Sequence, residues 1–359
     1  MEQFLLNPFA LPDSFALFSQ KDLKLSRKQR RDIRNKALKR QQKMDQLTQM
    51  VARAEKLQGP TPTLSIEQYP ETVNNIIGSW LAKGVDKYHI ELFCCLWMCN
   101  HPHMNARAPF GMFDRFMGYL KSHIARDINR YLGRRHQLWA ERYKSIQILD
   151  QPSQINRMLY CMTNPQKANL VNSLDEWPGI SSRDYLLIGT DPVFLSFDRT
   201  RWHRNKKPKN IGPYLYTVTL KHAVLPQLKE LCPIERQRWF AELVATRERV
   251  FQDARNQSGK PVLGIDKLME ADPTQRPRNA KRTWQPLCHA QDRGLRKAYA
   301  TAWRLLMDTY KICSNKYKKG DVRVIFPAGM FCPSRYPPAR EPDDPRNASL
   351  PYLCTCGGA

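Results

Sequence analysis

Apolar residues recur at helical spacing in some stretches of the chain and form short β-favouring runs in others, which predicts a mixed α and β fold. The clearest helix has apolar residues repeating at spacings of three and four and ends at Gly133. Strands are expected over 90–98 and 146–149. A helix is expected over 153–163 and should stop at Asn164, because a residue that precedes proline disfavours the helical region. The apolar positions of the first helix are Phe113, Phe116, Met117, Leu120, Ile124 and Ile128.

The flanking segments predict more helix than strand. Residues 61–83 should carry a short helix with Val73, Ile76, Ile77 and Trp80 on one side. Beyond about residue 190 the pattern changes, and prolines become frequent again after Pro327. The expected elements there are a basic loop at 199–209, an alternating strand at 214–220, and helices near 234–256 and 293–315.

This pattern predicts three domains and an α+β fold class. They are a basic helical arm over 1–60, a central domain over 61–190, and a mainly helical C-terminal domain over 191–359 with a loose, Pro-rich tail. The central domain should be a small antiparallel sheet with helices on one face. Cys354 and Cys356 are placed in the mobile tail.

The charge of the chain favours a polyanionic partner. The formal net charge is +25, so nucleic acid is expected as the partner, and no apolar run is long enough to span a membrane. Between Lys21 and Lys43 lie eleven Lys or Arg and only two Asp, in a predicted helix over 21–57 that Ser26 and Gln29 begin as a capping box. This run is interpreted as an arm along phosphates, and its representative cations are Arg27, Lys28, Arg30 and Arg31.

The cysteines and the N-terminus indicate the compartment. The ten cysteines have no regular spacing, which is typical of reduced thiols in the cytosol. The first twenty residues lack a basic leading segment and a cleavage site, so a secretory signal is not expected. A cytoplasmic protein associated with the nucleoid is predicted.

Four residues are candidates for a chemical site. His101 and His103 are two apart beside a predicted strand, so both imidazoles can face the same side and share a metal. Cys99 could join them in a zinc site, which then needs a fourth ligand. Tyr160 and Asn164 are one helical turn apart and should face the same way, opposite a buried stripe of Ile155, Leu159 and Met162.

Several motifs in this order resemble one known family. "MCNHPHM", the helix "FMGYLKSHIARDINRYLG", then "LWAERYKS", "LYCMTNPQKANLV" and "DEWPGISS" look like the REP-associated tyrosine transposases, which belong to the HUH single-tyrosine transposase superfamily. The resemblance covers roughly residues 89–182. The ending "GDVRVIFPAGMF" is also similar to longer members with a C-terminal extension.

The resemblance implies a fold, a chemistry and a set of roles. The fold is an HUH, ferredoxin-like palm. His101, His103 and Asn164 correspond to the ligands of Mg²⁺ or Mn²⁺, and Tyr160 to the nucleophile. The implied activity is nicking and rejoining of single-stranded or hairpin DNA through a covalent 5′-phosphotyrosine. A divalent cation suits this chemistry because a phenol with a pKa near 10 is a poor nucleophile at neutral pH.

A basic aromatic cluster follows the first helix. It comprises Trp139, Arg142, Tyr143 and Lys144, preceded by Arg134 and Arg135. Two interpretations remain open: the rings stack on single-stranded bases between the cations, or they pack into the core while the cations are solvated. The resemblance favours contact with DNA.

Two features differ from the family pattern and keep alternatives open. Pro102 stands where the family has a bulky hydrophobic residue, and Asn105, Ala106 and Arg107 follow where the family has an apolar run. A strand that would pair beside the histidine strand is not found between 61 and 79. The alternatives are a catalytically silent protein on the same scaffold that binds DNA or RNA, and a zinc-stabilised structural protein.

Overall fold

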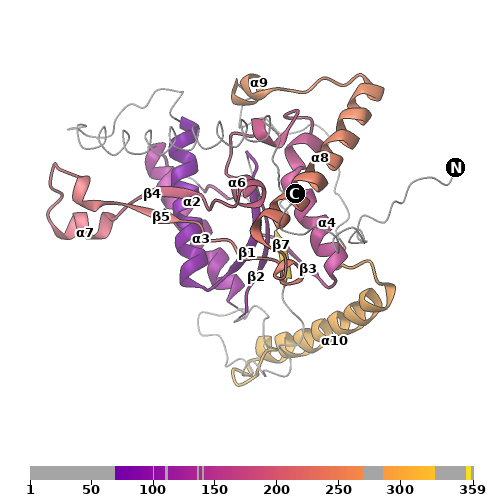
Figure 1. The fold of residues 1–359 in the computed structure, drawn as a ribbon. Helices are drawn as coiled ribbons and strands as arrows, with labels where there is room; N and C mark the ends of the chain where they lie inside the picture. Colours follow the sequence, from indigo (N-terminus) through magenta and orange to yellow (C-terminus); the bar gives the residue numbers. More distant parts are fainter. Residues whose placement is uncertain are drawn as a thin grey trace. The chain divides into compact units, whose positions relative to one another are not determined.

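A computed structural model describes residues 69–99, 101–109, 112–135, 137–139, 141–270, 286–327 and 353–356 (Figure 1). The predicted arm over 1–60 lies outside these residues. The described elements, in chain order, are α2 (Tyr69–Lys87), β1 (Glu91–Trp97), β2 (Pro102–Arg107), α3 (Phe113–Tyr131), β3 (Ser145–Ile148), α4 (Gln151–Met162), α5 (Asn164–Lys167), η3 (Leu174–Glu176), α6 (Arg183–Ile188), β4 (Val193–Phe197), α7 (Arg199–Arg204), η4 (Gly212–Tyr214), β5 (Leu215–Thr219), η5 (Pro226–Leu228), α8 (Pro233–Ser258), α9 (Ile265–Glu270), β6 (Cys288–His289), α10 (Arg293–Lys318) and β7 (Leu353–Cys356).

Five of the strands form one sheet in the order β1-β2-β7-β3-β6. β1 and β2 are an antiparallel hairpin in which Leu96 lies opposite His103 and Trp97 opposite Pro102. The pairs β2–β7 and β7–β3 are antiparallel, whereas β3 and β6 are parallel. The mixture of helices and small sheets confirms the α+β class, but the prediction of an antiparallel sheet is wrong for the β3–β6 edge.

The tail prediction is wrong at residues 353–356, which form the strand between β2 and β3. Asn105 pairs with Thr355, and Thr355 pairs in turn with Ile146. The sequence placed β6 and β7 in a separate C-terminal domain; both strands pair instead with strands of the 61–190 segment. A segment of four residues is too short to show the alternation of apolar and polar residues that identifies a strand. Its role as a strand follows only from its pairing with β2 and β3, whose backbone groups on those edges would otherwise lack partners.

Helices cover both faces of the sheet, not one as the sequence predicted. Successive side chains of a strand point to opposite faces. On β2, Met104 and Ala106 belong to the core built with α2 and α3. Asn105 faces the other way, where its Nδ2 donates to the Gln154 carbonyl of α4 at 3.3 Å. Figure 1 shows α2 and α3 on one side of the sheet and α4 and α8 on the other.

The helix prediction for 113–131 is confirmed residue by residue. All six predicted apolar positions of α3 are buried, and Gly133 follows the helix with φ +64°. α2 presents Ile77 to the same core, with Val73, Ile76 and Trp80 packed against it. Burial of this continuous apolar set is the main source of stability for the sheet face opposite α4.

A small second unit comprises, among the described residues, Leu195–Tyr216. β4 and β5 pair as a two-stranded sheet, which confirms the strand predicted near 214–220. The basic loop predicted at 199–209 is partly helical, because Asp198 caps α7 by accepting a hydrogen bond from the Arg201 amide at 2.9 Å.

The long helices of the C-terminal half and the free cysteines match the predictions from the sequence. α8 and α10 lie where helices were expected. No helix among the described residues is long and apolar enough to cross a membrane. The cysteines at positions 94, 95, 99, 161, 232, 288 and 313 are free thiols.

Candidate metal and nucleophile site

The two histidines lie at the start of β2, after the turn of the β1–β2 hairpin. The Met98 amide donates to the His101 carbonyl at 2.9 Å and closes this turn. Pro102 is the first residue of β2, and the β2–β7 pairing begins only at Met104. The missing proline N–H therefore leaves no gap in that ladder, and β2 continues with Asn105 buried.

The imidazoles of His101 and His103 converge on one point. Their Nε2 atoms are 3.0 Å apart, and the rings stand at 80° to each other. His103 is only 6% exposed. Burial, together with the charges of His101 and Lys167, lowers its pKa to about 4, and burial also lowers the pKa of His101. Both rings are therefore neutral at pH 7, so each has an unprotonated nitrogen to offer.

Asn164 and Tyr160 reach the same histidine from the helical side. The Asn164 Nδ2 atom is 2.5 Å from His103 Nε2, and the Tyr160 and His103 ring centroids are 5.6 Å apart at 89°. A helix break separates the two residues, since α4 ends at Met162 and Asn164 begins α5. Tyr160 is partly exposed, while the predicted stripe of Ile155, Leu159 and Met162 is buried. The structure thus brings all four candidate residues together across some sixty positions of sequence.

The donor set is compatible with a small divalent cation. Two neighbouring ligands of an octahedral ion at about 2.1 Å are separated by about 3.0 Å. The Nε2–Nε2 distance is 3.0 Å, which matches this separation. A half-turn of the Asn164 amide exchanges its nitrogen and oxygen, and the carbonyl oxygen is the donor that Mg²⁺ and Mn²⁺ prefer. The same 3.0 Å also suits a hydrogen bond between one protonated and one unprotonated ring nitrogen.

The cysteine-based zinc site is not assembled. Cys99 is exposed, and the described residues contain no group of three or more His, Cys, Asp or Glu side chains that could hold a metal ion. The predicted zinc set of Cys99, His101 and His103 therefore finds no support in this geometry.

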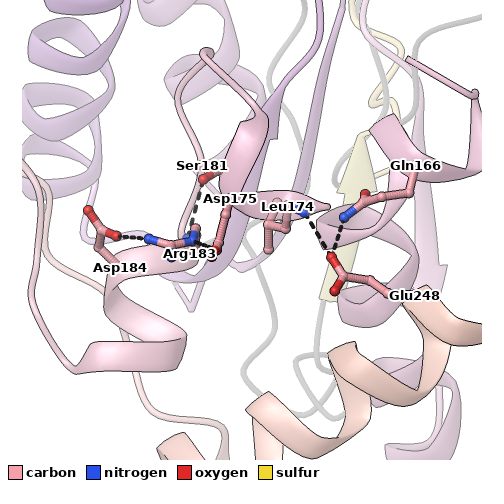
Figure 2. Close-up of polar contacts among 7 residues, drawn as sticks. All are labelled: Gln166, Leu174, Asp175, Ser181, Arg183, Asp184 and Glu248. Carbon is pink, nitrogen blue, oxygen red and sulfur yellow. Dashed lines mark hydrogen bonds and ion pairs between the residues drawn. The ribbon is translucent and has the colours of Figure 1, made fainter. Parts of the chain in front are cut away.

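Contacts with α8 fix the position of α5. Figure 2 shows Glu248 between Gln166 and Leu174: its Oε1 accepts from Gln166 Nε2 at 2.7 Å and from the Leu174 amide at 2.8 Å. Arg255 of α8 adds a longer bond to the Gln166 carbonyl, at 3.4 Å. Gln166 is fully buried two residues after Asn164. Glu248 therefore holds the short helix that carries Asn164.

The loop before α6 is held in a similar way. Arg183 bonds Asp175, and its Nη1 lies 2.8 Å from Asp184 (Figure 2). These acidic partners raise the pKa of Arg183 against the opposing effect of burial. The ion pairs link the turn around η3 to the start of α6.

The basic aromatic cluster has a packed and a solvated part. The Trp139 Nε1–H donates to the Lys121 carbonyl at 2.9 Å, and Tyr143 lies edge-on to Phe113 at 5.7 Å. Both rings pack against the core while remaining partly exposed. Two of the cations contact nearby polar side chains: Arg134 donates to Asn129 at 2.9 Å, and the Lys144 Nζ atom lies 3.7 Å from a Glu141 carboxylate oxygen. Arg135 and Arg142 are exposed.

Sequence reasoning missed a Ser-His-Asp arrangement. Ser182 Oγ lies 2.7 Å from His222 Nε2, and His222 Nδ1 lies 2.7 Å from Asp191 Oδ1. Ser182 is 0% exposed, as is the side chain of His222, and the Ser182 hydroxyl also accepts from the Cys95 amide at 2.7 Å. A nucleophile without exposed surface cannot meet a substrate. The three residues therefore serve as a buried hydrogen-bonded link between β1, α6 and the segment after β5.

Sequence reasoning also missed the cations that surround Tyr160. Arg157 Cζ lies 4.9 Å and Lys167 Nζ 4.6 Å from the Tyr160 ring centroid. The spacing of Arg157, one turn before Tyr160 on the same helix, was the available signal. The predicted arm residues Arg27, Lys28, Arg30 and Arg31 lie outside the described residues.

Comparisons with known proteins return no relatives. No protein-family model matches the chain, and neither the curated proteins nor the solved structures include a match. The function is therefore argued from the site itself.

Proposed function

We propose that this chain nicks and rejoins single-stranded DNA through a covalent 5′-phosphotyrosine on Tyr160, with Mg²⁺ or Mn²⁺ held by His101, His103 and Asn164. The observation that carries the proposal is the convergence of these side chains. Two neutral imidazoles, of buried His103 and partly exposed His101, face each other at 3.0 Å, an amide lies 2.5 Å from His103, and a partly exposed phenol lies beside that same ring.

Each residue has a defined task in this reaction. The imidazoles contribute unprotonated Nε2 atoms because burial keeps them neutral, and Asn164 contributes its amide oxygen. When bound, the divalent cation would polarise the scissile phosphate and stabilise the leaving oxygen. The Tyr160 hydroxyl attacks the phosphorus atom, forming the tyrosyl O–P bond and breaking the bond from phosphorus to the 3′ oxygen. The phenolic proton ends on the released 3′-hydroxyl, so no oxidant or reductant is needed and the new ester conserves the bond for rejoining.

The finer fold assignment belongs to the same proposal. An HUH-type palm is supported by a hairpin that presents two histidines toward a helix bearing the tyrosine. β7 occupies the position beside the histidine strand for which no candidate was found in 61–79. Single-stranded or hairpin DNA as partner and a cytoplasmic, nucleoid-associated location complete the proposal, supported by the charge of +25.

The test is formation of a protein–DNA adduct. Wild-type protein incubated with labelled hairpin or single-stranded DNA and Mn²⁺ should give a covalent band in a denaturing gel. Tyr160→Phe should give none and still bind DNA, because phenylalanine keeps the ring and lacks the attacking oxygen. Tyr131→Phe on α3, which packs on the opposite face of the sheet, is the matched control and should react like wild type. An adduct in Tyr160→Phe at the wild-type rate would refute the assignment.

A second candidate is a DNA- or RNA-binding protein without catalysis. It is favoured by the contacts among the candidate ligands, since His101 and Asn164 each lie within hydrogen-bonding distance of His103 Nε2, and these contacts need no ion. Tight binding of hairpin DNA with no adduct in Mg²⁺ or Mn²⁺, and no Mn²⁺ binding by calorimetry, would select this function.

A further inference from the structure

Basic side chains from three elements gather at the nucleophile. Arg157 of α4 and Lys167 of α5 both lie over the Tyr160 ring, at 4.9 and 4.6 Å from its centroid. Arg247 of α8 donates to Asn156 Oδ1 at 3.2 Å, next to Arg157 in sequence. The charge of Arg247 and, above all, burial lower the pKa of Arg157. Arg157 and Arg247 are therefore close enough to repel each other.

Among the described residues, no ion pair joins Arg157, Lys167 or Arg247 to an acidic side chain. Glu248, the neighbour of Arg247 in sequence, directs Oε1 to Gln166 and Leu174 instead. Arg157 and Arg247 are partly buried, and partly buried cations without a counterion are costly. Together with the exposed Lys167, they favour an anionic ligand.

Cation–π contact with Tyr160 does not by itself account for the cluster. A cation over the ring of a partly exposed tyrosine contributes only weak stabilisation. Arg247 makes its hydrogen bond to a neutral amide. Burial and the charge of Arg157 also lower the pKa of His289 on β6 to about 4.

We propose that Arg157, Lys167 and Arg247 form a phosphate-binding site that holds the backbone of single-stranded DNA beside the Tyr160 side chain. The inference rests on the proposed function for the identity of the anion. Arg157 and Arg247 offer planar guanidinium groups for bidentate contact with phosphate oxygens, and Lys167 offers a point charge. Bases are not read by this site, so the contacts position the strand and are independent of sequence.

The test measures binding without cleavage, in EDTA, with the full-length chain. The probe is a single-stranded oligonucleotide whose affinity is followed over a range of salt concentrations. Arg157→Gln, Lys167→Gln and Arg247→Gln should each reduce the magnitude of the log–log salt slope by about 0.7, and the triple variant by about 2. Two controls should keep the wild-type slope: Arg249→Gln, exposed on the same helix, and Lys83→Gln, whose ammonium lies 4.3 Å from the Trp80 centroid.

A set of oligonucleotides with one neutral methylphosphonate each locates the contact. At one or two positions the neutral linkage should weaken binding to wild type and have no effect on the triple variant. Charge-conserving Arg157→Lys and Lys167→Arg should keep most of the slope. Equal slopes in the triple variant and the controls, with no position-specific effect, would overturn the inference; so would equal losses in the charge-conserving and neutral variants.

Failure of the proposed nicking activity and failure of the phosphate-binding site give different results. If wild type forms no adduct with Mn²⁺ but the methylphosphonate effect is present, the phosphate site stands and the nicking activity falls. If the adduct forms and the effect is absent, the activity stands and the phosphate site falls.

Discussion

Replacing Glu248 with alanine should loosen α5 and weaken metal binding without touching a proposed ligand. The substitution removes the acceptor of two donors, the Gln166 side chain at 2.7 Å and the Leu174 amide at 2.8 Å (Figure 2). Both residues are buried, and a buried donor left without a partner costs about 1–3 kcal/mol. Glu248 is itself partly exposed, so water can replace part of what is lost. We therefore expect the free energy of unfolding to fall by about 2–3 kcal/mol.

The functional consequence follows from the position of α5. Asn164 lies two residues before Gln166, so a loosened α5 no longer presents the amide to His103. Loss of a residue that orients a ligand typically lowers metal affinity by about 10- to 100-fold. Urea denaturation measures the first effect and titration calorimetry with Mn²⁺ the second.

Two matched variants make this prediction decisive. Glu248→Gln keeps an acceptor oxygen and should lose about 1 kcal/mol or less of unfolding free energy. Glu242→Ala, exposed on the same helix, should change it by less than about 0.5 kcal/mol. The reasoning is refuted if Glu248→Ala matches Glu242→Ala in both stability and Mn²⁺ affinity.

Three further predictions concern the sheet, the buried histidines and the arm. Deleting residues 353–359 removes the backbone partner of both β2 and β3, so the free energy of unfolding should fall by about 3 kcal/mol or more. The backbone amides of residues 104–107 should then exchange hydrogen faster, and unchanged exchange there would contradict the β7 pairing. His103 and His289 have pKa values lowered to about 4 from 6.5, so the unfolded chain binds protons first as the pH falls. The stability of the metal-free protein should be fully present above about pH 7 and drop by up to about 5 kcal/mol by pH 4.5, at most about 2.6 kcal/mol from each histidine and less from His289, which solvent partly screens. His289→Gln should flatten part of that slope in denaturation curves. Deleting residues 1–57 should reduce the salt dependence of DNA binding, and an unchanged slope would exclude the arm as a phosphate contact.

The sequence by itself determined the helices whose apolar residues recur at regular helical spacing. The apolar stripe of α3 was predicted at every buried position, because helical spacing alone selects the face that packs. In α4 the predicted stripe of Ile155, Leu159 and Met162 is buried and Tyr160 stays partly exposed, but the buried face is wider and also includes Met158 and Cys161. The proline rule predicted a helix over 153–163 that stops at Asn164. α4 ends at Met162, close to this prediction, but Asn164 then begins the short helix α5.

Only the tertiary structure decided what meets across the sheet. The four-residue β7 has no period to reveal it, and its position follows from the free backbone groups of β2 and β3 that need partners. Pro102 looked unsuitable for a strand, but pairing with β7 begins two residues later, so the missing N–H is not required there. Arg247 and Glu248 come from a helix about eighty residues beyond Asn164, and no local pattern links them. Pairing, packing and charge compensation act between distant segments, so the geometry of the site was fixed by the fold.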